Sequence, residues 1–333
     1  MSRGVLLCLI AALAAGAPAP AQASRPPEDQ GPTQVHIGIF VLDVDEINTA
    51  NQNFDANVYV EYRWRDPRAV GGGPDNVARS LHEIWHPRIL FVNLQRNWRA
   101  FPQIVEVSPD GEVTYFQRAW ATFSQPLNLE RFPFDRQVFT IQLASAGYAL
   151  DEVELLTDPD SAGGIAQDLS VADWDILGWK VESAPFVPVP GEDAVPGISF
   201  TFEAERKTGY FIVKVIIPLL LIVFMSWIVF WIDPKESGSQ ISVAITAMLT
   251  LIAYRFAVGS DLPKVSYLTR LDYFILGSTV LVFASLLEVV VTSTYAGTGR
   301  LEHARAIDRW SSWLFPAVFI LFTVQALLNP LGI

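Results

Sequence analysis

Five residues near position 250 have the types and spacing to handle ions in water. Ser242, Thr246, Leu249, Ala253 and Phe256 follow one another at intervals of 4, 3, 4 and 3 residues, which places them on one face of a predicted helix. Where several copies of such a helix surround an axis, hydroxyls replace part of an ion's hydration shell, and apolar rings close the path by excluding water. An ordinary buried helix whose Ser and Thr side chains bond their own backbone would show the same pattern, so both interpretations stay open.

An acidic residue precedes this face. Glu236 would form a carboxylate ring at the inner mouth of such a path, or would act only as a favourable charge at a helix N-terminus. Ser237 and Gln240 have the Ser-x-x-Gln spacing of a capping box, which predicts the start of the helix.

Two ionisable residues lie inside apolar segments, where charge is costly. We expect Arg255 to reach the membrane surface and Glu288 to face a wet cavity between helices.

A different chemistry is suggested by His82, Glu83 and His86, which fit the His-Glu-x-x-His pattern. On a helix this pattern presents two imidazoles to zinc, with the Glu as general base of a hydrolase. However, Pro87 follows directly and residues 71–74 are rich in glycine, which leaves little room for a long helix. A membrane-anchored zinc hydrolase is therefore the alternative from another class, and we expect neither an enzyme nor a metal site.

The elements that must position these residues divide the chain near Arg206. Short alternating runs separated by turn residues predict an all-β, immunoglobulin-like sandwich over residues 35–206. Residues 207–333 form the predicted membrane domain, a four-helix transmembrane bundle. Its four apolar segments, at about 210–232, 241–258, 273–294 and 310–328, are each long enough to cross a bilayer as a helix.

Charge differs between the two parts. Residues 24–206 contain 28 Asp and Glu against 13 Lys and Arg, a net charge of −15, whereas residues 207–333 contain 7 against 9, a net charge of +2. A strongly acidic domain repels nucleic acid and enriches small cations around it. We therefore expect no nucleic-acid partner.

The first 23 residues have the pattern of a signal peptide, with Arg3 before a short apolar core and small residues at the predicted cleavage site. The one cysteine, Cys8, lies inside it, so the mature protein would have no thiol. A polar lead-in follows at residues 24–34. Export would place the sandwich outside, as the periplasmic domain of a multi-pass protein of the bacterial inner membrane. The arginines at 300, 305 and 309 would then be cytoplasmic, as the positive-inside rule favours.

A series of short motifs runs in order along the chain. The longest is Phe132-Pro133-Phe134-Asp135 with Gln137, between the sandwich and the first apolar segment. The others are Trp64-Arg65-Asp66, Trp85-His86-Pro87 with Asn93, Arg206-Lys207, Pro218 with Ser226-Trp227 and Phe230-Trp231, and Leu262-Pro263-Lys264. This ordered series resembles the Cys-loop receptor (pentameric ligand-gated ion channel) superfamily, over roughly residues 35–329, and the last motif is similar to that of its prokaryotic members.

The resemblance implies five subunits around a central pore, with ligand sites between neighbouring sandwiches. It assigns pore-lining positions to Ser242, Thr246, Leu249, Ala253 and Phe256. It places Glu236 on a cytoplasmic acidic ring. Gln125 and Phe139 stand where the signature loop of the family has two cysteines. Ser239 stands where many cation-selective members carry an acidic residue, so cation selectivity would rest on Glu236 and the outer charge.

The aromatic box that holds amine ligands in the family is poorly kept, since Val92 and Ala146 occupy two of its positions. Phe91, Tyr148 and Glu192 are the nearby candidates for ligand binding, with plain packing as the alternative for the two rings. Protons are the agonist that we expect, because partial burial can raise a carboxyl pKa into a useful range.

By resemblance, coupling between the two domains falls on Phe132, Pro133, Asp135, Arg206 and Pro263. We expect Asp135 and Arg206 to form an ion pair at the junction, against Pro263 and the turn at residues 48–53. The expected protein is a homopentameric, cation-conducting, ligand-gated ion channel without a cofactor. Its partners would be identical subunits, membrane lipids, protons or a small ligand, and monovalent cations. A membrane sensor of the same fold that does not conduct is the alternative.

Overall fold

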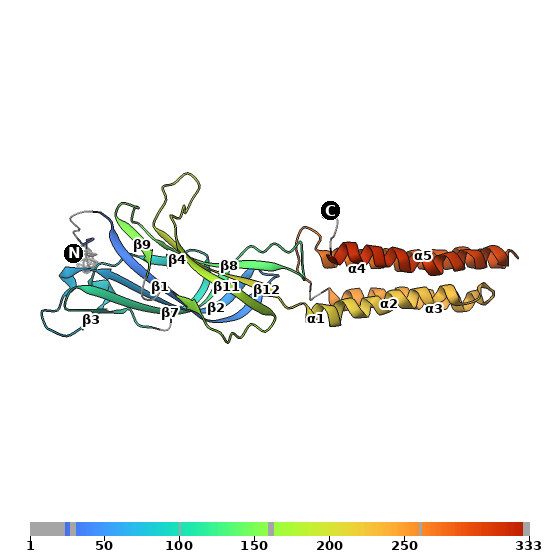
Figure 1. Ribbon diagram of the computed structural model, residues 1–333, viewed down its shortest axis with the longest axis horizontal. Coiled ribbons are helices and arrows are strands. Elements are labelled where there is room, and N and C mark those ends of the chain that lie inside the picture. The colour runs from blue at the N-terminus through green and yellow to red at the C-terminus, as the bar shows by residue number, and fades with distance from the viewer. Residues whose placement is uncertain (1–23, 27–30, 100, 159–162, 260–261, 329–333) are drawn as a thin grey trace, which may run out of the picture.

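The computed structural model describes residues 24–26, 31–99, 101–158, 163–259 and 262–328. The signal peptide predicted at residues 1–23 and part of the predicted lead-in lie outside these ranges. Figure 1 shows an elongated molecule with β-sheets at one end and long helices at the other. The predicted fold class, a β-sandwich followed by four long apolar helices, is confirmed.

The larger sheet of the sandwich has eight strands in the order β10-β1-β2-β7-β6-β3, with β5 paired to β7 and β9 paired to β1. Its strands are β1 (Thr33–Asn48), β2 (Asn53–Arg65), β3 (Val77–Ser80), β5 (Leu94–Arg99), β6 (Ile104–Val107), β7 (Glu112–Ser124), β9 (Val153–Thr157) and β10 (Gly164–Ile165). Along β2 every second side chain is buried, from Phe54 to Trp64. This period of two is what a strand with one face on the core requires.

The smaller sheet has four strands in the order β11-β12-β8-β4. Its strands are β4 (Ile89–Phe91), β8 (Arg136–Ser145), β11 (Trp174–Ser183) and β12 (Gly197–Arg206). Short 3₁₀ turns, η1 (Pro67–Ala69) and η2 (Leu81–Glu83), lie in the connections. The two sheets meet at an aromatic core in which Phe54 of β2 contacts Phe139 of β8 and Phe202 of β12, with ring centroids 5.3 and 5.6 Å apart.

Four helical segments are long and apolar enough to cross a membrane: Gly209–Trp231, Pro234–Val258, Arg270–Gly297 and Leu301–Leu327. The first consists of α1 (Gly209–Phe211), a π-helical turn η3 (Ile212–Ile216), α2 (Ile217–Ile228) and a 3₁₀ turn η4 (Val229–Trp231). The second begins with η5 (Pro234–Glu236) and continues as α3 (Ser237–Val258), and the last two are α4 (Arg270–Gly297) and α5 (Leu301–Leu328).

Three of the four observed helices are longer than the apolar runs that predicted them, and the first has the predicted length. The largest difference is at α5, which begins at Leu301, whereas apolarity begins only at Trp310. The arginines at 305 and 309 are therefore part of the helix and not of a connector. Charged residues are good helix formers, so hydropathy marks the membrane-embedded part of a helix but not its polar ends.

The predicted capping box at the start of α3 is wrong. Glu236 is the N-cap residue and no side chain caps this end. Gln240 is fully buried, and its amide nitrogen donates to the backbone oxygens of Val229 at 3.4 Å and Ile232 at 2.9 Å. The end of the preceding helical segment has unpaired carbonyls, and Gln240 satisfies them instead of reaching back to its own helix.

Candidate functional site

An ion pair lies at the junction of the sandwich and the helices. Asp135 precedes β8 and Arg206 ends β12. The Arg206 Nε atom lies 2.8 Å from Asp135 Oδ1, and its Nη2 atom lies 3.2 Å from Asp135 Oδ2. Asp135 is 1 % exposed and Arg206 5 %. The predicted ion pair is therefore present, and it is bidentate and buried.

The surroundings of this pair satisfy both charges. The Arg206 guanidinium carbon lies 4.2 Å from the ring centre of Trp174 and 4.9 Å from that of Phe132. Its Nη2 atom also reaches the Thr49 hydroxyl at 3.4 Å, in the turn between β1 and β2. Gln137 donates its amide to Asp135 Oδ2 at 2.8 Å. A buried ion pair persists only when its remaining hydrogen-bonding groups find partners, and here they come from four segments of the sandwich.

The loop that carries Asp135 also contacts the membrane helices. The backbone nitrogen of Leu271, in the first turn of α4, donates to the Phe132 carbonyl at 3.2 Å. The Phe132 ring packs edge-on against Phe211 of α1, with centroids 4.8 Å apart, and the Phe132–Pro133 peptide is cis. One short loop thus touches the first and third helical segments.

The connector between α3 and α4 meets this loop through Tyr267, whose hydroxyl accepts from the Leu129 nitrogen at 2.8 Å. Arg270 adds a backbone bond to the Glu130 oxygen at 3.0 Å. Pro263 lies in the same connector and is partly buried. Its packing against the ion pair stays a prediction, while Phe132 of the loop contacts Arg206 directly.

The predicted stripe on α3 lies on a face that the rest of the chain leaves open. All five of its side chains are exposed, with Leu249 60 % and Phe256 83 % accessible. The opposite face is buried against the other helices, at Ala244, Ala247 and Leu251. The helix therefore packs on its small and aliphatic face and presents Ser242 and Thr246 outward.

The Thr246 hydroxyl on this face has a defined orientation. Thr246 donates its proton to the Ser242 backbone oxygen at 2.8 Å. Own-backbone bonding, which was the alternative interpretation of the stripe, is therefore real for Thr246, but its helix face is open and not buried. Because the proton is used, the Thr246 oxygen presents lone pairs outward. Glu236, at the start of the helix, is also exposed.

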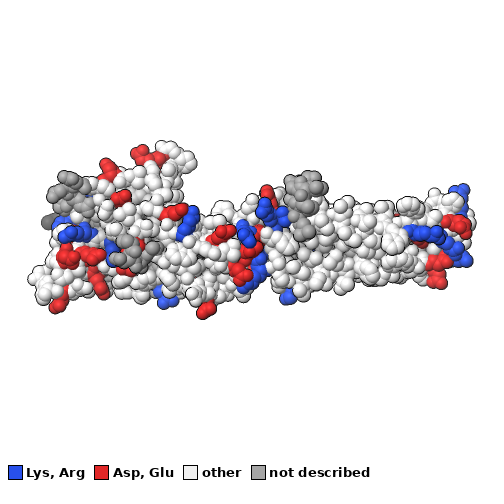
Figure 2. Space-filling model, in the orientation of Figure 1, with Lys and Arg blue, Asp and Glu red and all other residues white. Residues whose placement is uncertain are grey.

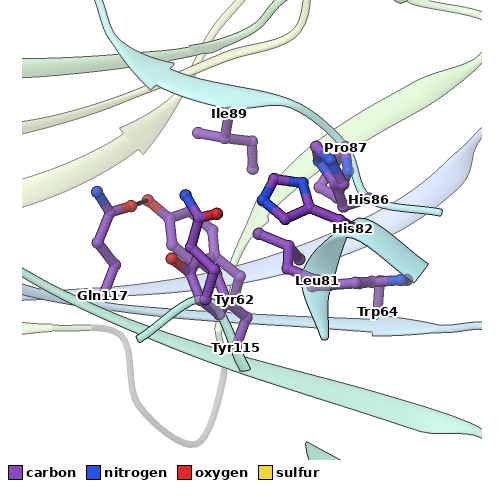
Figure 3. Close-up of a pocket in the computed structure, with 10 residues that line it drawn as sticks. Tyr62, Trp64, Leu81, His82, His86, Pro87, Ile89, Tyr115 and Gln117 are labelled. Atoms are coloured by element: carbon purple, nitrogen blue, oxygen red, sulfur yellow. Dashed lines mark hydrogen bonds between the residues drawn. The ribbon is translucent and has the colours of Figure 1, made fainter. Parts of the chain in front are cut away.

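A cavity of about 140 Å³ lies inside the sandwich, beside the histidines of the zinc pattern (Figure 3). Tyr62 and Tyr115 stack at its wall with centroids 5.6 Å apart, and the Tyr62 hydroxyl donates to Gln117 Oε1 at 3.2 Å. Sequence reasoning missed this cavity. Its polar lining comes from β2, β7 and the segments that carry His82, His86 and Gln103. These segments are far apart in the sequence, so no local spacing signals the cavity.

The two histidines do not form a zinc site. His82 lies in the three-residue turn η2, and His86 follows it in an extended segment. Without a helix the two imidazoles do not share the geometry that the pattern requires. Burial, with the charge of Arg88 adding to it, lowers the pKa of His86. No three His, Cys, Asp or Glu side chains of the described residues converge as a metal site, so the geometry around His82 and His86 gives the hydrolase alternative no support.

The three candidate ligand residues differ in exposure and in the contacts that they make. Phe91 is 7 % exposed and packs edge-on against Phe123 in the core. Tyr148 accepts a hydrogen bond from Trp85 Nε1 at 2.8 Å, and the Arg88 guanidinium lies 5.6 Å from its ring centre. Glu192 is exposed in the loop between β11 and β12. Plain packing is thus the role that the structure gives Phe91.

An aromatic patch on the outer face of the larger sheet was also missed. Trp98 of β5 and Trp120 of β7 are 59 % and 52 % exposed, with ring centroids 5.7 Å apart. Tyr59 stacks on Phe116 at 5.7 Å on the same sheet. Buried and more exposed residues alternate along β7, and Phe116 and Trp120 both occupy positions that face outward. This alternation could have predicted the aromatic patch from the sequence. Exposed apolar patches of this kind commonly mark contact surfaces.

Carboxyl groups near this patch are perturbed. Burial raises the pKa of Glu61, with repulsion from Asp158 adding to it and attraction to Arg63 opposing it. Burial and repulsion from Asp43 also raise the pKa of Asp45. Both groups belong to the sandwich and take up protons more readily than free carboxyls do.

Comparisons with known proteins agree with this architecture. The model of the neurotransmitter-gated ion-channel ligand-binding domain matches residues 21–208, and that of the neurotransmitter-gated ion-channel transmembrane region matches residues 215–303. The gamma-aminobutyric acid receptor subunit beta-4 of Gallus gallus is 28 % identical over 297 residues, which are 86 % of this chain. The matched segment covers 60 % of that relative, so the chain spans less than two thirds of its length.

Proposed function

Since this chain belongs to the neurotransmitter-gated ion-channel family, whose members are not enzymes, we propose that it forms a ligand-gated channel that conducts cations through a pore lined by α3. The observation that carries the proposal is the face of α3 that stays open. It begins with the hydroxyls of Ser242 and Thr246 and ends with Leu249, Ala253 and Phe256, while the opposite face is buried.

The order of side chains along this face supports a gate. Leu249 and Phe256 are large and are 60 % and 83 % exposed in the single chain, so copies of the helix around an axis would bring their side chains together. Rings of such apolar groups expel water from a narrow pore and stop ions without a physical plug. The gate is therefore assigned to Leu249 and Phe256, and the hydrated lower part of the pore to Ser242 and Thr246.

Cation selectivity is supported by charge and by hydroxyl orientation. Glu236 stands exposed at the start of α3, where a ring of its carboxylates would lie at the cytoplasmic mouth. The Thr246 oxygen turns its lone pairs outward because its proton is bound to Ser242. The outer domain, with a net charge of −15, raises the local concentration of cations. Monovalent cations are the proposed permeant ions.

Assembly from identical copies gives the aromatic patch a partner. Trp98 and Trp120 are more than half exposed on the larger sheet, and a neighbouring sandwich would cover them. The resemblance to the Cys-loop receptor superfamily implies that this assembly is a pentamer. Apolar residues on α4 and α5 that remain exposed, such as Val280 and Leu321, would contact membrane lipids.

Gating would pass through the junction. The bond from Leu271 to Phe132 and the ring contact from Phe132 to Phe211 tie the loop to two helices, while the Asp135–Arg206 pair ties it to the sandwich. A change in the sandwich would therefore move the loop and the connector that contains Pro263, and tilt α3. Widening of the Leu249 and Phe256 rings would then let water in.

Protons are the proposed agonist. The raised pKa values of Glu61 and Asp45 bring two outer-domain carboxyls toward the range in which mild acidification protonates them. Asp45 lies on β1, whose end forms the turn that contacts Arg206, so its charge acts on a strand connected to the junction. The proposed location is the inner membrane of a bacterium, with the sandwich in the periplasm.

Single-channel recording tests this function directly. Purified protein in a planar bilayer is expected to give cation currents when the solution on the sandwich side is acidified from neutral pH. Currents that do not change with pH would reject protons as agonist but keep the channel. Correctly folded protein that carries no current under any tested ligand would favour the non-conducting sensor.

A further inference from the structure

Two carboxyl groups meet inside the helical bundle. Glu288 of α4 lies against Asp308 and Ser311 of α5. Asp308 is 4 % exposed, and both oxygens of Glu288 are buried although its stem is partly accessible. Glu288 stands nine residues before the inner end of α4, about 14 Å along the helix. Glu288 therefore lies within the membrane-spanning part of α4, and it meets Asp308 two residues before the apolar part of α5 begins.

Charged side chains elsewhere avoid this region. Figure 2 shows Lys, Arg, Asp and Glu gathered at the two ends of the helical part, with an almost uncharged stretch between them. At the inner end, Arg305 forms an ion pair with Asp233 at 2.9 Å. Among the described residues, no lysine, arginine or histidine forms an ion pair with Glu288 or Asp308.

The groups that face the pair from the neighbouring elements supply no compensating charge. From α3, Gln240 donates its amide to Asp308 Oδ2 at 3.2 Å. Asp233, before η5, adds a further negative charge near Asp308. The end of the first helical segment offers only the backbone oxygens of Val229 and Ile232, which Gln240 already uses. The environment of the two carboxyls is thus either neutral or negative.

The hydrogen bonds at this cluster are incomplete in one specific way. Asp308 Oδ1, Gln240 Oε1 and both oxygens of Glu288 are buried and receive no hydrogen bond from any described residue. All of these atoms are acceptors, and the donors beside them are the Ser311 hydroxyl and the Gln240 amide, so the cluster has fewer donors than acceptors. Two adjacent carboxylates in an apolar interior repel each other strongly, and such pairs hold one proton between them. A bound proton removes the repulsion and also supplies an O–H donor.

A metal ion is a poor alternative occupant. No group of three His, Cys, Asp or Glu side chains converges here or elsewhere in the described parts of the chain. Hard cations prefer six or more oxygen ligands, or several waters, and two carboxyls buried among apolar helices do not provide them.

We propose that Glu288 and Asp308 form a proton-binding site in the inner part of the membrane domain, where one shared proton holds α5 against α4 and, through Gln240, against α3. The site differs from the proposed agonist sites, because Glu61 and Asp45 lie in the sandwich. Loss of this proton leaves two charges with no cation to offset them and weakens the packing of α5. The site would thus make the bundle sensitive to cytoplasmic alkalinisation.

Infrared difference spectroscopy tests the proton itself. The full-length protein in lipid nanodiscs should show the carbonyl band of a protonated carboxyl at neutral pH, and this band should vanish at alkaline pH. Glu288→Gln removes the partner of Asp308 and should abolish the band. Glu302→Gln, which changes an exposed carboxyl at the start of α5, should keep it. A neutral-pH spectrum without the band in the wild-type protein would overturn the proposal.

Thermal unfolding gives a second measurement with a defined sign. The folded protein would hold one proton that the unfolded chain releases, so its melting temperature should fall as pH rises from mildly acidic values. One proton corresponds to a fall of about 2 °C for each pH unit in a chain of this length. Glu288→Gln should remove this part of the slope, and Glu302→Gln should retain it.

If Glu288→Gln does not fold, Asp308→Asn replaces it, and this variant must lose the band or change the pH at which it disappears. Equal slopes in the wild-type protein and in the pair variants would overturn the proposal. Neither measurement uses an ion current. A negative result here would therefore reject the proton site without rejecting the channel function, and the absence of current in a bilayer would not reject the proton site.

Discussion

The backbone nitrogen of Leu271 donates to the carbonyl of Phe132 across 3.2 Å, and this bond joins the first turn of a membrane helix to the loop at the foot of the sandwich. Phe132 lies beneath the Arg206 guanidinium at 4.9 Å, and Arg206 holds Asp135. A chain of direct contacts therefore leads from strand β12 to α4. Because each link is buried, a displacement at one end has few ways to be absorbed before it reaches the other.

Removal of one partner of the junction ion pair should be severe. Asp135→Ala leaves Arg206 buried without its carboxylate, which we expect to lower the free energy of unfolding by about 3–5 kcal/mol and to impair gating or assembly. Denaturant unfolding and agonist-evoked currents measure the two effects. Arg136→Ala is the control, since its bridge to Glu205 is exposed and worth about 1 kcal/mol or less. Normal currents and stability in Asp135→Ala would refute the coupling role.

The proposed gate can be tested with a substitution that makes the apolar constriction polar. Leu249→Ser places a hydroxyl in the apolar ring, so we expect a pore that leaks ions without agonist. Ile252→Ser, at an exposed position outside the stripe, should not leak. Resting conductance in liposomes or bilayers distinguishes the two variants. A Leu249→Ser pore that stays tightly closed would place the gate elsewhere.

The open face of α3 predicts which positions water reaches. Thr246→Cys should react with an aqueous thiol reagent in at least one state of the channel, while Ala247→Cys, on the fully buried face, should not. The background is low because Cys8, in the predicted signal peptide, is the one cysteine of the chain. Protection of Thr246→Cys in every state would show that this face does not line a pore.

Glu236 should govern the choice between cations and anions. Glu236→Gln removes the proposed ring of carboxylates, so we expect the permeability ratio of cations to anions to fall. The reversal potential in a salt gradient measures this ratio. Glu302→Gln is the matched control, since it removes an exposed carboxyl at the same end of the molecule but from α5. An unchanged reversal potential in Glu236→Gln would leave selectivity to other groups.

Proton activation should depend on Glu61. Since burial raises its pKa, protonation of Glu61 occurs at a higher pH than for a free carboxyl, and the folded state is favoured as pH falls through that range. Glu61→Gln mimics the protonated form, so we expect currents to begin at higher pH and to depend less steeply on pH. Glu106→Gln, on the same sheet but exposed, should leave the curve unchanged. Identical curves for the wild type and Glu61→Gln would exclude this site.

The sequence by itself determined the two-part fold, because both signals are local. A period of two along β2 and apolar runs of membrane length depend only on neighbouring residues. The same holds for the stripe on α3, since a helix of any environment puts Thr246 and Leu249 on one side. The Asp135–Arg206 pair was also predictable, although only through an ordered set of motifs.

Contacts between distant segments were decided by the tertiary structure. Ser237 and Gln240 have the spacing of a capping box, yet Gln240 turns to the carbonyls of Val229 and Ile232, because the packing of α3 on the preceding segment buries it there. The burial of Phe91 and the meeting of Glu288 with Asp308 likewise depend on which helix or strand lies opposite. The spacing of residues along the sequence does not say which helix or strand lies opposite, because that arrangement results from the packing of the whole chain.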